Sequence, residues 1–190
     1  MNFSEIKPAC LACEKCDLCK TRTQVVFGSG NPEAEVLFIG EAPGKNEDEQ
    51  GLPFVGRSGQ LLDQYLAAIH LNRKENIFIT NIVKCRPPEN RDPLPNEWAA
   101  CLPWLREQFA CMNPKIVVCL GRIAAQRIIR PDFSVMKEHG QWTEKSGTFF
   151  TATLHPAALL RNPNNKPLAF DDFAAIRAKI EEVCTHTYQK

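Results

Sequence analysis

Short apolar runs alternate with amphipathic stretches along this chain, and their order predicts an α/β fold. Four runs have the length and composition of buried strands, at residues 35–40, 77–80, 115–120 and in the stretch TATL before His155. Apolar residues recur at helical spacing over three longer stretches, at residues 59–70, 96–112 and 168–184. A short helix is expected after Gly121, followed by a hairpin-like stretch with its turn near Gly147. This alternation predicts a three-layer α/β/α sandwich around a central, mostly parallel four-stranded sheet.

Composition narrows the class of protein. The 190 residues, 44% hydrophobic and 24% charged, are ordinary globular usage and suffice for one compact domain over residues 1–190. No apolar run is long enough to span a membrane, and the first residues do not resemble a secretory signal. We therefore expect a cytoplasmic monomer that does not contact membranes. A net charge of +1 is low for a nucleic-acid binder, so any DNA contact must be local.

The sheet topology brings three loops together. The first is GEAPG, directly after the strand at residues 35–40, and the second is the proline-rich segment that begins at Asn81. The third contains His155 and Pro156. Because ligands of open α/β sheets bind at the carboxyl edge of the strands, we expect these loops to form the site. A long irregular loop such as the second is unusual in a compact domain unless it has a function.

The three loops belong to longer segments that resemble one known family. These segments are GEAPGKNEDEQGLPFVGRSGQLLD at residues 40–63, TNIVKCRPPENR at residues 80–91 and HPAALLRNP at residues 155–163. Jointly and in this order they resemble the family-4, iron-sulfur uracil-DNA glycosylases, over nearly the whole stretch from Cys13 to Pro163. The resemblance implies an enzyme that flips uracil out of DNA and hydrolyses its N-glycosidic bond. Free uracil and an abasic site would result, which initiates base excision repair.

The resemblance implies three residues that contact uracil. Phe54 would stack on the base, the amide of Asn81 would pair with O4 and N3–H, and His155 would donate to the charge that develops on uracil. Residue type alone leaves other roles open. Phe54 could equally belong to the core, Asn81 could cap or form a turn, and His155 could be structural.

Acidic residues cluster in the first segment. The sugar becomes positively charged as the bond breaks, so a carboxylate there could stabilise it or orient the attacking water. The resemblance puts Glu41 and Glu47 at the pocket, where one or both could instead shape it. Ala42 occupies a substrate-contacting position at which the most active uracil glycosylases carry Asp or Asn, and we infer weaker activation of water here.

DNA contacts are expected from the second and third segments. Leu159, Leu160 and Arg161 could wedge into the base stack, although a short helix that packs a leucine into the core is the alternative. Basic residues near the same edge could hold phosphates, namely Lys84, Arg86, Arg91 and Arg161.

Nine cysteines are many for a reducing compartment and favour a metal site over disulfides. Four thiolates can hold an iron-sulfur cluster or a zinc ion, and two sets are possible. One is the local run Cys10, Cys13, Cys16 and Cys19. The other is Cys13, Cys16, Cys85 and Cys101, which the family resemblance favours, and it would hold one [4Fe-4S] cluster with a structural role. Two alternatives stay open: Cys10 or Cys19 could replace one of these ligands, and zinc could replace the cluster. The other cysteines, Cys111, Cys119 and Cys184, are expected to be buried thiols.

Two other functions fit parts of the sequence. Relatives that trap uracil-DNA covalently have a histidine-containing insertion after the Asn-bearing strand, and the corresponding PPENRDPLP here has no histidine. A redox or electron-transfer module built on the cysteines would leave Phe54, Asn81 and His155 without a role. The expected partner is therefore uracil-containing DNA, single- or double-stranded.

Overall fold

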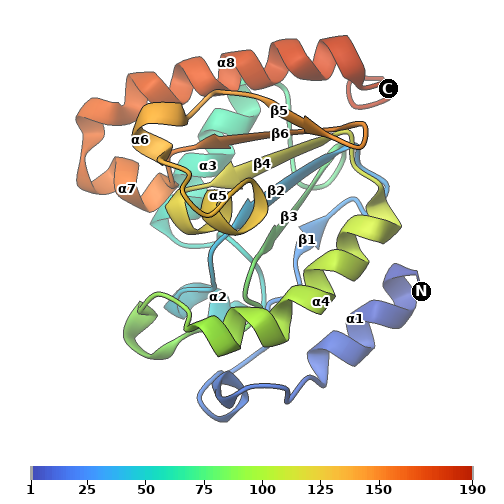
Figure 1. The fold of residues 1–190 in the computed structure, drawn as a ribbon, viewed down its shortest axis with the longest axis vertical. Helices are drawn as coiled ribbons and strands as arrows, with labels where there is room; N and C mark the ends of the chain where they lie inside the picture. Colours follow the sequence, from blue (N-terminus) through green and yellow to red (C-terminus); the bar gives the residue numbers. More distant parts are fainter. Residues whose placement is uncertain (1, 190) are drawn as a thin grey trace.

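A computed structural model describes residues 2–189, which form one six-stranded sheet with helices on both faces (Figure 1). Its strands are β1 (Ser29–Gly30), β2 (Val36–Gly40), β3 (Ile77–Asn81), β4 (Ile116–Leu120), β5 (Thr143–Lys145) and β6 (Thr148–Thr153). Its α-helices are α1 (Phe3–Leu11), α2 (Lys45–Gln50), α3 (Arg57–Ala68), α4 (Pro95–Met112), α5 (Arg122–Ile128), α6 (Val135–Glu138), α7 (Pro156–Arg161) and α8 (Lys166–Val183). Short 3₁₀ turns lie at Asp17–Lys20, Pro88–Asn90 and Pro163–Asn165.

The order of strands in the sheet is β1-β3-β2-β4-β6-β5. The four inner strands are parallel, as their crossover connections require, and β1 and β5 pair antiparallel at the two edges. Gly40 of β2 is paired with Asn81 of β3, so these two strands end level with each other. The loops that follow the parallel strands therefore share one edge of the sheet.

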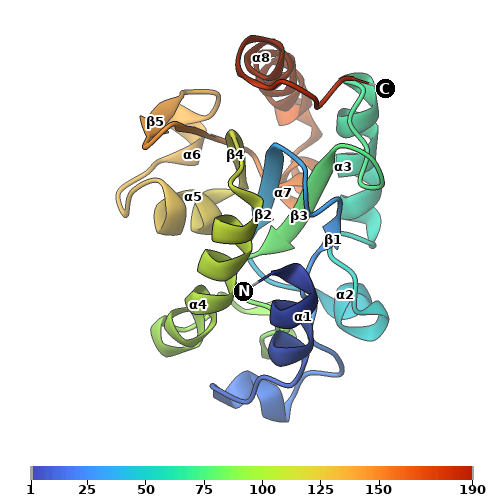
Figure 2. The same ribbon diagram turned by 90° about the vertical axis from the view of Figure 1, so that its right-hand side faces the viewer.

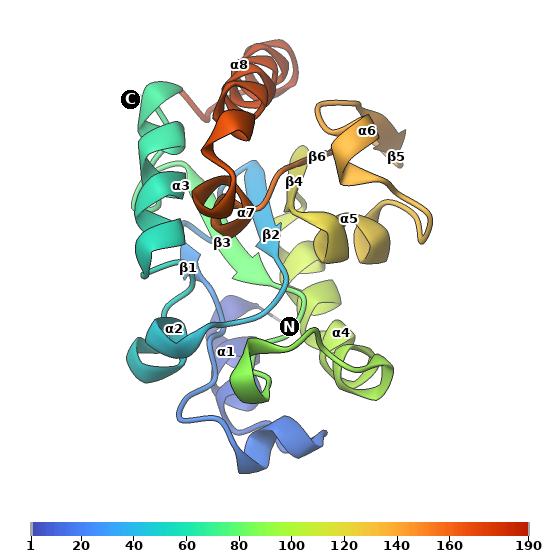
Figure 3. The ribbon, with the colours of Figure 1, turned by 90° about the vertical axis from the view of Figure 1, so that its left-hand side faces the viewer.

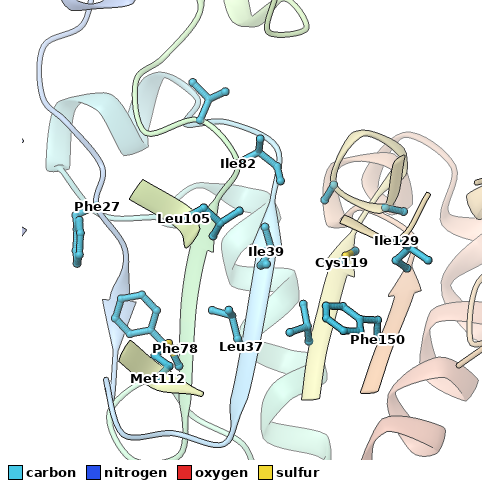
Figure 4. Packing of buried hydrophobic residues seen from close by; sticks show 14 of the residues in the cluster. Phe27, Leu37, Ile39, Phe78, Ile82, Leu105, Met112, Cys119, Ile129 and Phe150 are labelled. Carbon is cyan, nitrogen blue, oxygen red and sulfur yellow. The ribbon is translucent and has the colours of Figure 1, made fainter. Parts of the chain in front are cut away.

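Side chains along a strand point alternately to the two faces of the sheet, so the core is divided between these faces. In β2, Leu37 and Ile39 pack with α1, α4 and α5, whereas Val36 and Phe38 pack with α3, α7 and α8. Figure 4 shows the first of these clusters. In Figure 2, α5, α4 and α1 lie to the left of and below the strands, and α8 and α3 lie above and to the right. The predicted three-layer sandwich is confirmed.

The amino-terminal segment packs against the first face. Phe3 of α1 makes edge-to-face contacts with Phe27 and Phe78, with ring centroids 5.7 and 5.1 Å apart. Further along, the buried Asp48 carboxylate accepts hydrogen bonds from the Thr23 and Gln24 backbone N–H groups. These contacts hold the cysteines of the amino-terminal segment beside the loop after β3.

The four inner strands and the three long helices agree with the pattern-based prediction to within a few residues, and β5 and β6 form the expected hairpin. The sheet has six strands instead of the four predicted, because β1 was not foreseen and β5 of the hairpin joins the opposite edge. The loop expected to contain His155 and Pro156 is wrong, because Pro156–Arg161 is the helix α7, the alternative that the sequence left open for this segment. Proline is favourable at the first helical position, and the His155 side chain caps this helix. Among the described helices, none is both long and apolar enough to cross a membrane.

Candidate active site and cysteine cavity

A pocket opens at the carboxyl edge of the sheet, on the side of the molecule that Figure 3 presents, where α2, α5 and α7 lie. Its lining includes residues from all three predicted loops. Of the residues predicted for the site, those that line it are Glu41, Ala42, Glu47, Phe54, Asn81, Arg91, His155 and Arg161. The topology therefore brings together residues that lie more than a hundred positions apart in the chain.

Asn81 ends β3 with a buried side chain that is only 2% exposed. Its Oδ1 is one of a few buried polar atoms in residues 2–189 that have no hydrogen-bond partner. Gly40, the residue paired with it in the sheet, leaves the space that this amide occupies. A Cβ at Gly40 would collide with both the Asn81 side chain and the Phe54 ring. Since an unpaired buried acceptor costs about 1–3 kcal/mol, the Asn81 oxygen is suited to an N–H donor of a ligand.

Phe54 and His155 form another part of the wall. The ring centroid of Phe54 lies 5.7 Å from that of His155, with 32° between the ring planes. Phe54 is buried and has a positive φ of 52°. Together the rings give the pocket an apolar, aromatic surface beside the polar Asn81 amide.

The protonation of His155 follows from its contacts. Nδ1 accepts a hydrogen bond from the Ala157 backbone N–H at 3.0 Å, so the proton of the neutral ring is on Nε2. Burial lowers the pKa of His155 to about 4, and the Arg161 charge acts in the same direction, while Glu47 opposes them. The imidazole is therefore a neutral N–H donor at physiological pH.

The two acids of the first loop differ in their surroundings. Burial raises the pKa of Glu41 to about 7, with the neighbouring Asp92 carboxylate adding to the rise and Arg122 opposing it. Glu47 Oε1 instead accepts hydrogen bonds from Val55 N at 3.1 Å and Gly56 N at 3.3 Å. Glu47 is thus bonded to the loop that carries Phe54, whereas Glu41 is a carboxyl group poised to ionise near neutral pH.

Two of the residues expected to contact DNA are buried. Leu159 is 1% exposed and packs in the core between α3 and α8, so its prediction as an exposed wedge is wrong. Lys84 is 0% exposed, and its Nζ donates to Thr80 Oγ1, Asn81 O and Gln108 Oε1 at 2.6–2.8 Å. These three acceptors come together only in the folded protein, and they remove Lys84 from the surface.

The other candidates lie nearer to solvent. Arg161 is exposed at the pocket, and Leu160 is partly buried against the core. Arg86 donates to Asn90 Oδ1 at 2.7 Å and does not line the pocket. Arg91 makes a two-pronged ion pair with Glu97, at 2.7 and 2.8 Å, so its guanidinium is already neutralised.

Asp92 and Arg122, which were not predicted from the sequence, also line the pocket and pair with each other at 2.9 Å. Arg122 follows Gly121 at the end of β4, so the rule that sites form at the carboxyl ends of strands could have identified it. No comparable signal marks Asp92.

A second cavity, which shares no described residue with the pocket, lies between the amino-terminal segment, the loop after β3 and α4. Five cysteines line it, namely Cys10, Cys13, Cys16, Cys85 and Cys101. Cys19 is not part of its lining. This arrangement brings together the long-range set of four cysteines, with Cys10 beside it.

N–H donors reach the sulfurs of the long-range set. Trp104 Nε1 donates to Cys13 Sγ at 3.3 Å, Arg22 Nη1 to Cys85 Sγ at 3.4 Å, and the Lys84 backbone N–H to Cys101 Sγ at 3.2 Å. Burial raises the pKa of Cys16, and the Leu18 backbone N–H opposes this rise. Such donors stabilise thiolates, which are the form that binds metal.

Cys10 differs from these four. Burial raises the pKa of the Cys10 thiol to about 12 and that of Cys85 to about 11, so burial alone does not set Cys10 apart; the difference within residues 2–189 is that no N–H donor acts on the Cys10 sulfur. Over the same residues, no group of three or more His, Cys, Asp or Glu side chains closes around a single metal position. The thiols instead surround the cavity.

Comparisons with known proteins point to one family. The family described as Uracil DNA glycosylase superfamily matches residues 27–179. A Type-4 uracil-DNA glycosylase of Sulfurisphaera tokodaii is 44% identical over 184 residues, 93% of this chain and 84% of the relative. A second Type-4 uracil-DNA glycosylase, from Archaeoglobus fulgidus, is 42% identical over 96% of this chain and 94% of the relative. A Type-5 uracil-DNA glycosylase of Pyrobaculum aerophilum is 30% identical over 82% of this chain and 75% of the relative.

Proposed function

Because the chain belongs to the uracil-DNA glycosylase superfamily and, within it, to the type-4 enzymes, we propose that its pocket excises uracil through Asn81, Phe54 and His155. The reaction hydrolyses the N-glycosidic bond, releases free uracil and leaves an abasic site for base excision repair. A base inside a duplex is inaccessible, so the nucleotide must first rotate out of the stack and into the pocket.

The buried, unpaired Oδ1 of Asn81 is the observation that carries this proposal. Uracil presents an N3–H donor next to the O4 acceptor, and a carboxamide matches both, with its oxygen accepting from N3–H and its NH₂ donating to O4. Cytosine presents the opposite pattern at these two positions. An amide that presents its oxygen to N3–H and its NH₂ to O4 therefore accepts uracil and rejects cytosine.

Phe54 supplies the stacking surface for the flipped base. Stacking of a base on an aromatic side chain contributes about 1–3 kcal/mol and tolerates any base, so it contributes affinity rather than selectivity. Selectivity then depends on the Asn81 amide, which lies against the same ring.

His155 acts on the leaving group. As the glycosidic bond breaks, negative charge develops on uracil, including its O2, and a neutral Nε2–H donor can stabilise it without a proton transfer. Because the donor is fixed by the Ala157 N–H before the reaction, little reorganisation is needed. A neutral imidazole held by burial is also a better match than an imidazolium for a group that must keep its proton.

Glu41 is the candidate for orienting water toward the sugar, since its carboxyl lines the pocket and ionises near neutral pH. Ala42 beside it offers no polar atom in its side chain, so Glu41 carries this task without the Asp or Asn found in faster relatives. Glu47, bonded to two backbone N–H groups, contributes mainly by shaping the loop that holds Phe54.

DNA outside the flipped nucleotide would contact the residues around the pocket. Arg161 is exposed there and is the strongest candidate for a phosphate contact. Arg86 and Arg91, in the loop after β3, are the other candidates. Leu160 remains the candidate wedge, because Leu159 is committed to the core. We further propose that the enzyme acts as a cytoplasmic monomer on single- or double-stranded DNA.

We propose that Cys13, Cys16, Cys85 and Cys101 hold one [4Fe-4S] cluster at the cysteine cavity. Support comes from the N–H donors directed at these sulfurs and from thiols that surround a cavity. Such a cluster supplies four metal–thiolate bonds that cross-link the chain. The four residues thereby tie the amino-terminal segment to α4 and to the loop that starts at Asn81, so their role is structural.

One assay tests the proposed function. The purified protein is incubated with an oligonucleotide containing a single uracil, and abasic sites are then cleaved with alkali. Matched oligonucleotides with cytosine or thymine at that position are the controls. We expect strand cleavage and free uracil only from the uracil substrate, and no protein–DNA adduct that survives boiling in detergent. Absence of free uracil would overturn the proposal, and a stable adduct would move the protein to the covalent relatives.

A further inference from the structure

Phe54 has a backbone conformation that its side chain does not favour. Its φ of 52° lies in the left-handed region, where residues with a Cβ are uncommon. Such a conformation persists only when its surroundings enforce it, and it is typical of functional positions. The groups that hold this backbone therefore decide where the Phe54 ring lies.

Arg73 holds the backbone of Phe54 from one side. Its Nη1 donates to the Pro53 carbonyl at 2.5 Å and its Nη2 to the Phe54 carbonyl at 2.6 Å. Its Nε donates to Asp63 Oδ1 at 2.9 Å, which fixes the guanidinium on α3. The Arg73 side chain is 18% exposed and is not part of the pocket lining. Each of the three nitrogens of this rigid, planar group thus donates a hydrogen bond outside the pocket.

Two further contacts complete this arrangement. Glu47 Oε1 accepts from the N–H groups of Val55 and Gly56, on the other side of the same loop. Gly59 of α3 backs the loop, and any Cβ there would collide with the Phe54 carbonyl. The carbonyls of residues 53 and 54 therefore face Arg73, the following amides face Glu47, and the ring has one position against Gly40 and His155.

We propose that Arg73 is a positioning residue for uracil recognition, which sets the Phe54 ring in its stacking position before DNA arrives. This inference rests on the proposed function. A ring that is already ordered loses no freedom when the base stacks on it, so binding is tighter. Without the guanidinium, the loop relaxes from its left-handed conformation and the ring samples other positions. His155 keeps its hydrogen bond from the Ala157 N–H, so the chemical step is affected less than binding.

The test is a comparison of Arg73→Gln with Lys74→Gln. Lys74 is an exposed neighbour, so the second variant loses the same charge without touching the loop. We expect Arg73→Gln to raise KM for uracil-containing DNA by roughly tenfold, within the range of a lost base stack, with kcat within about twofold of wild type. Arg73→Lys, which can reach one carbonyl, should recover part of this loss. Lys74→Gln should match wild type.

A double-mutant cycle with Phe54→Ala distinguishes positioning from general stabilisation. If Arg73 acts through the ring, Arg73→Gln adds no further rise in KM once the ring is absent. An additive rise, or an unchanged KM in Arg73→Gln, overturns the proposal. If Arg73→Gln fails to fold, Asp63→Asn weakens the same guanidinium without removing it and should raise KM by a smaller factor; an unchanged KM there also contradicts the proposal. A wild-type protein that releases no uracil would instead overturn the proposed function, and this inference with it.

Discussion

The Nδ1 atom of His155 accepts the Ala157 backbone N–H at 3.0 Å, so the start of α7 determines which nitrogen of the catalytic candidate carries the proton. The same residue that caps the helix thereby presents Nε2–H as a donor. Burial keeps the ring neutral, with a pKa of about 4. The hydrogen bond that caps α7 thus also sets the tautomer of His155 that the proposed reaction needs.

Replacing this donor should slow the chemical step. We predict that His155→Ala lowers the single-turnover rate of uracil release by roughly 10²-fold or more, the effect of losing one donor to a developing negative charge. DNA affinity should change little, because the donor acts mainly in the transition state. His70→Asn is the control, since His70 is exposed and asparagine tolerates its positive φ. Full activity in His155→Ala would remove this residue from the mechanism.

The pH profile should come from Glu41 and not from His155. A carboxyl with a pKa of about 7 is mostly protonated at pH 6 and mostly ionised at pH 8, so cleavage should rise through this interval if the carboxylate orients water. His155 is neutral above about pH 5, so its ionisation should not change the cleavage rate between pH 6 and pH 8. Glu41→Gln should lower the rate by roughly 10²-fold and flatten the profile. If the cleavage rate of Glu41→Gln still rises near pH 7, another group causes the pH dependence.

Stability gives an independent check on the same residue. The pKa of Glu41 is raised in the fold from an ordinary value of 4.5, so its ionisation opposes folding as the pH rises from 4.5 through 7. Glu41→Gln should therefore unfold at a higher temperature than wild type at pH 8, with a smaller difference at pH 5.

The cysteine cavity predicts which thiols hold metal. Purified protein should be brown, with broad absorbance near ~400 nm and about four irons per chain. Cys85→Ala and Cys101→Ala should lose the colour and most of the iron, because each removes a thiol that lines the cavity. Cys19→Ala should keep both, since Cys19 lies outside that lining. Loss of iron in Cys19→Ala, or one zinc and no iron in the wild type, would refute the assignment.

Glu35 should control stability in acid. Burial alone would raise the pKa of Glu35, but hydrogen bonds from the backbone N–H groups of Thr185, His186 and Thr187 and from the Thr185 and Thr187 hydroxyls lower this pKa to about 2. Its stabilising effect is complete above the ordinary value of 4.5 and is lost as the pH falls toward 2. Glu35→Gln should cost about 2–3 kcal/mol in the free energy of unfolding at pH 7 and much less near pH 2.5. Chemical denaturation at both pH values measures this, with exposed Glu33→Gln as the matched control.

The sequence predicted β2, β3 and β4 because each is built on a short apolar run, and it predicted the pocket because strand ends share an edge. It did not predict the burial of Leu159 or Lys84. The segment HPAALLR is compatible with both an exposed loop and a capped helix, and only packing against α3 and α8 decides between them. For Lys84, two acceptors at the end of β3 and one from Gln108 of α4 replace water, and only the fold brings Gln108 to them. Nothing in the pattern marks Arg73, whose partners are backbone carbonyls.

Uracil is proposed to be recognised and cut in the pocket that Asn81, Phe54 and His155 line together. Single-turnover excision from uracil- and cytosine-containing oligonucleotides, by wild type and by Asn81→Asp, tests this claim most directly. A carboxylate cannot donate to O4 and repels it, but it can accept from the cytosine amino group. We predict that Asn81→Asp cuts uracil roughly 10²-fold more slowly, and that its preference for uracil over cytosine falls. Uracil excision at the wild-type rate, with unchanged preference, would contradict the account, because another group would then read the base.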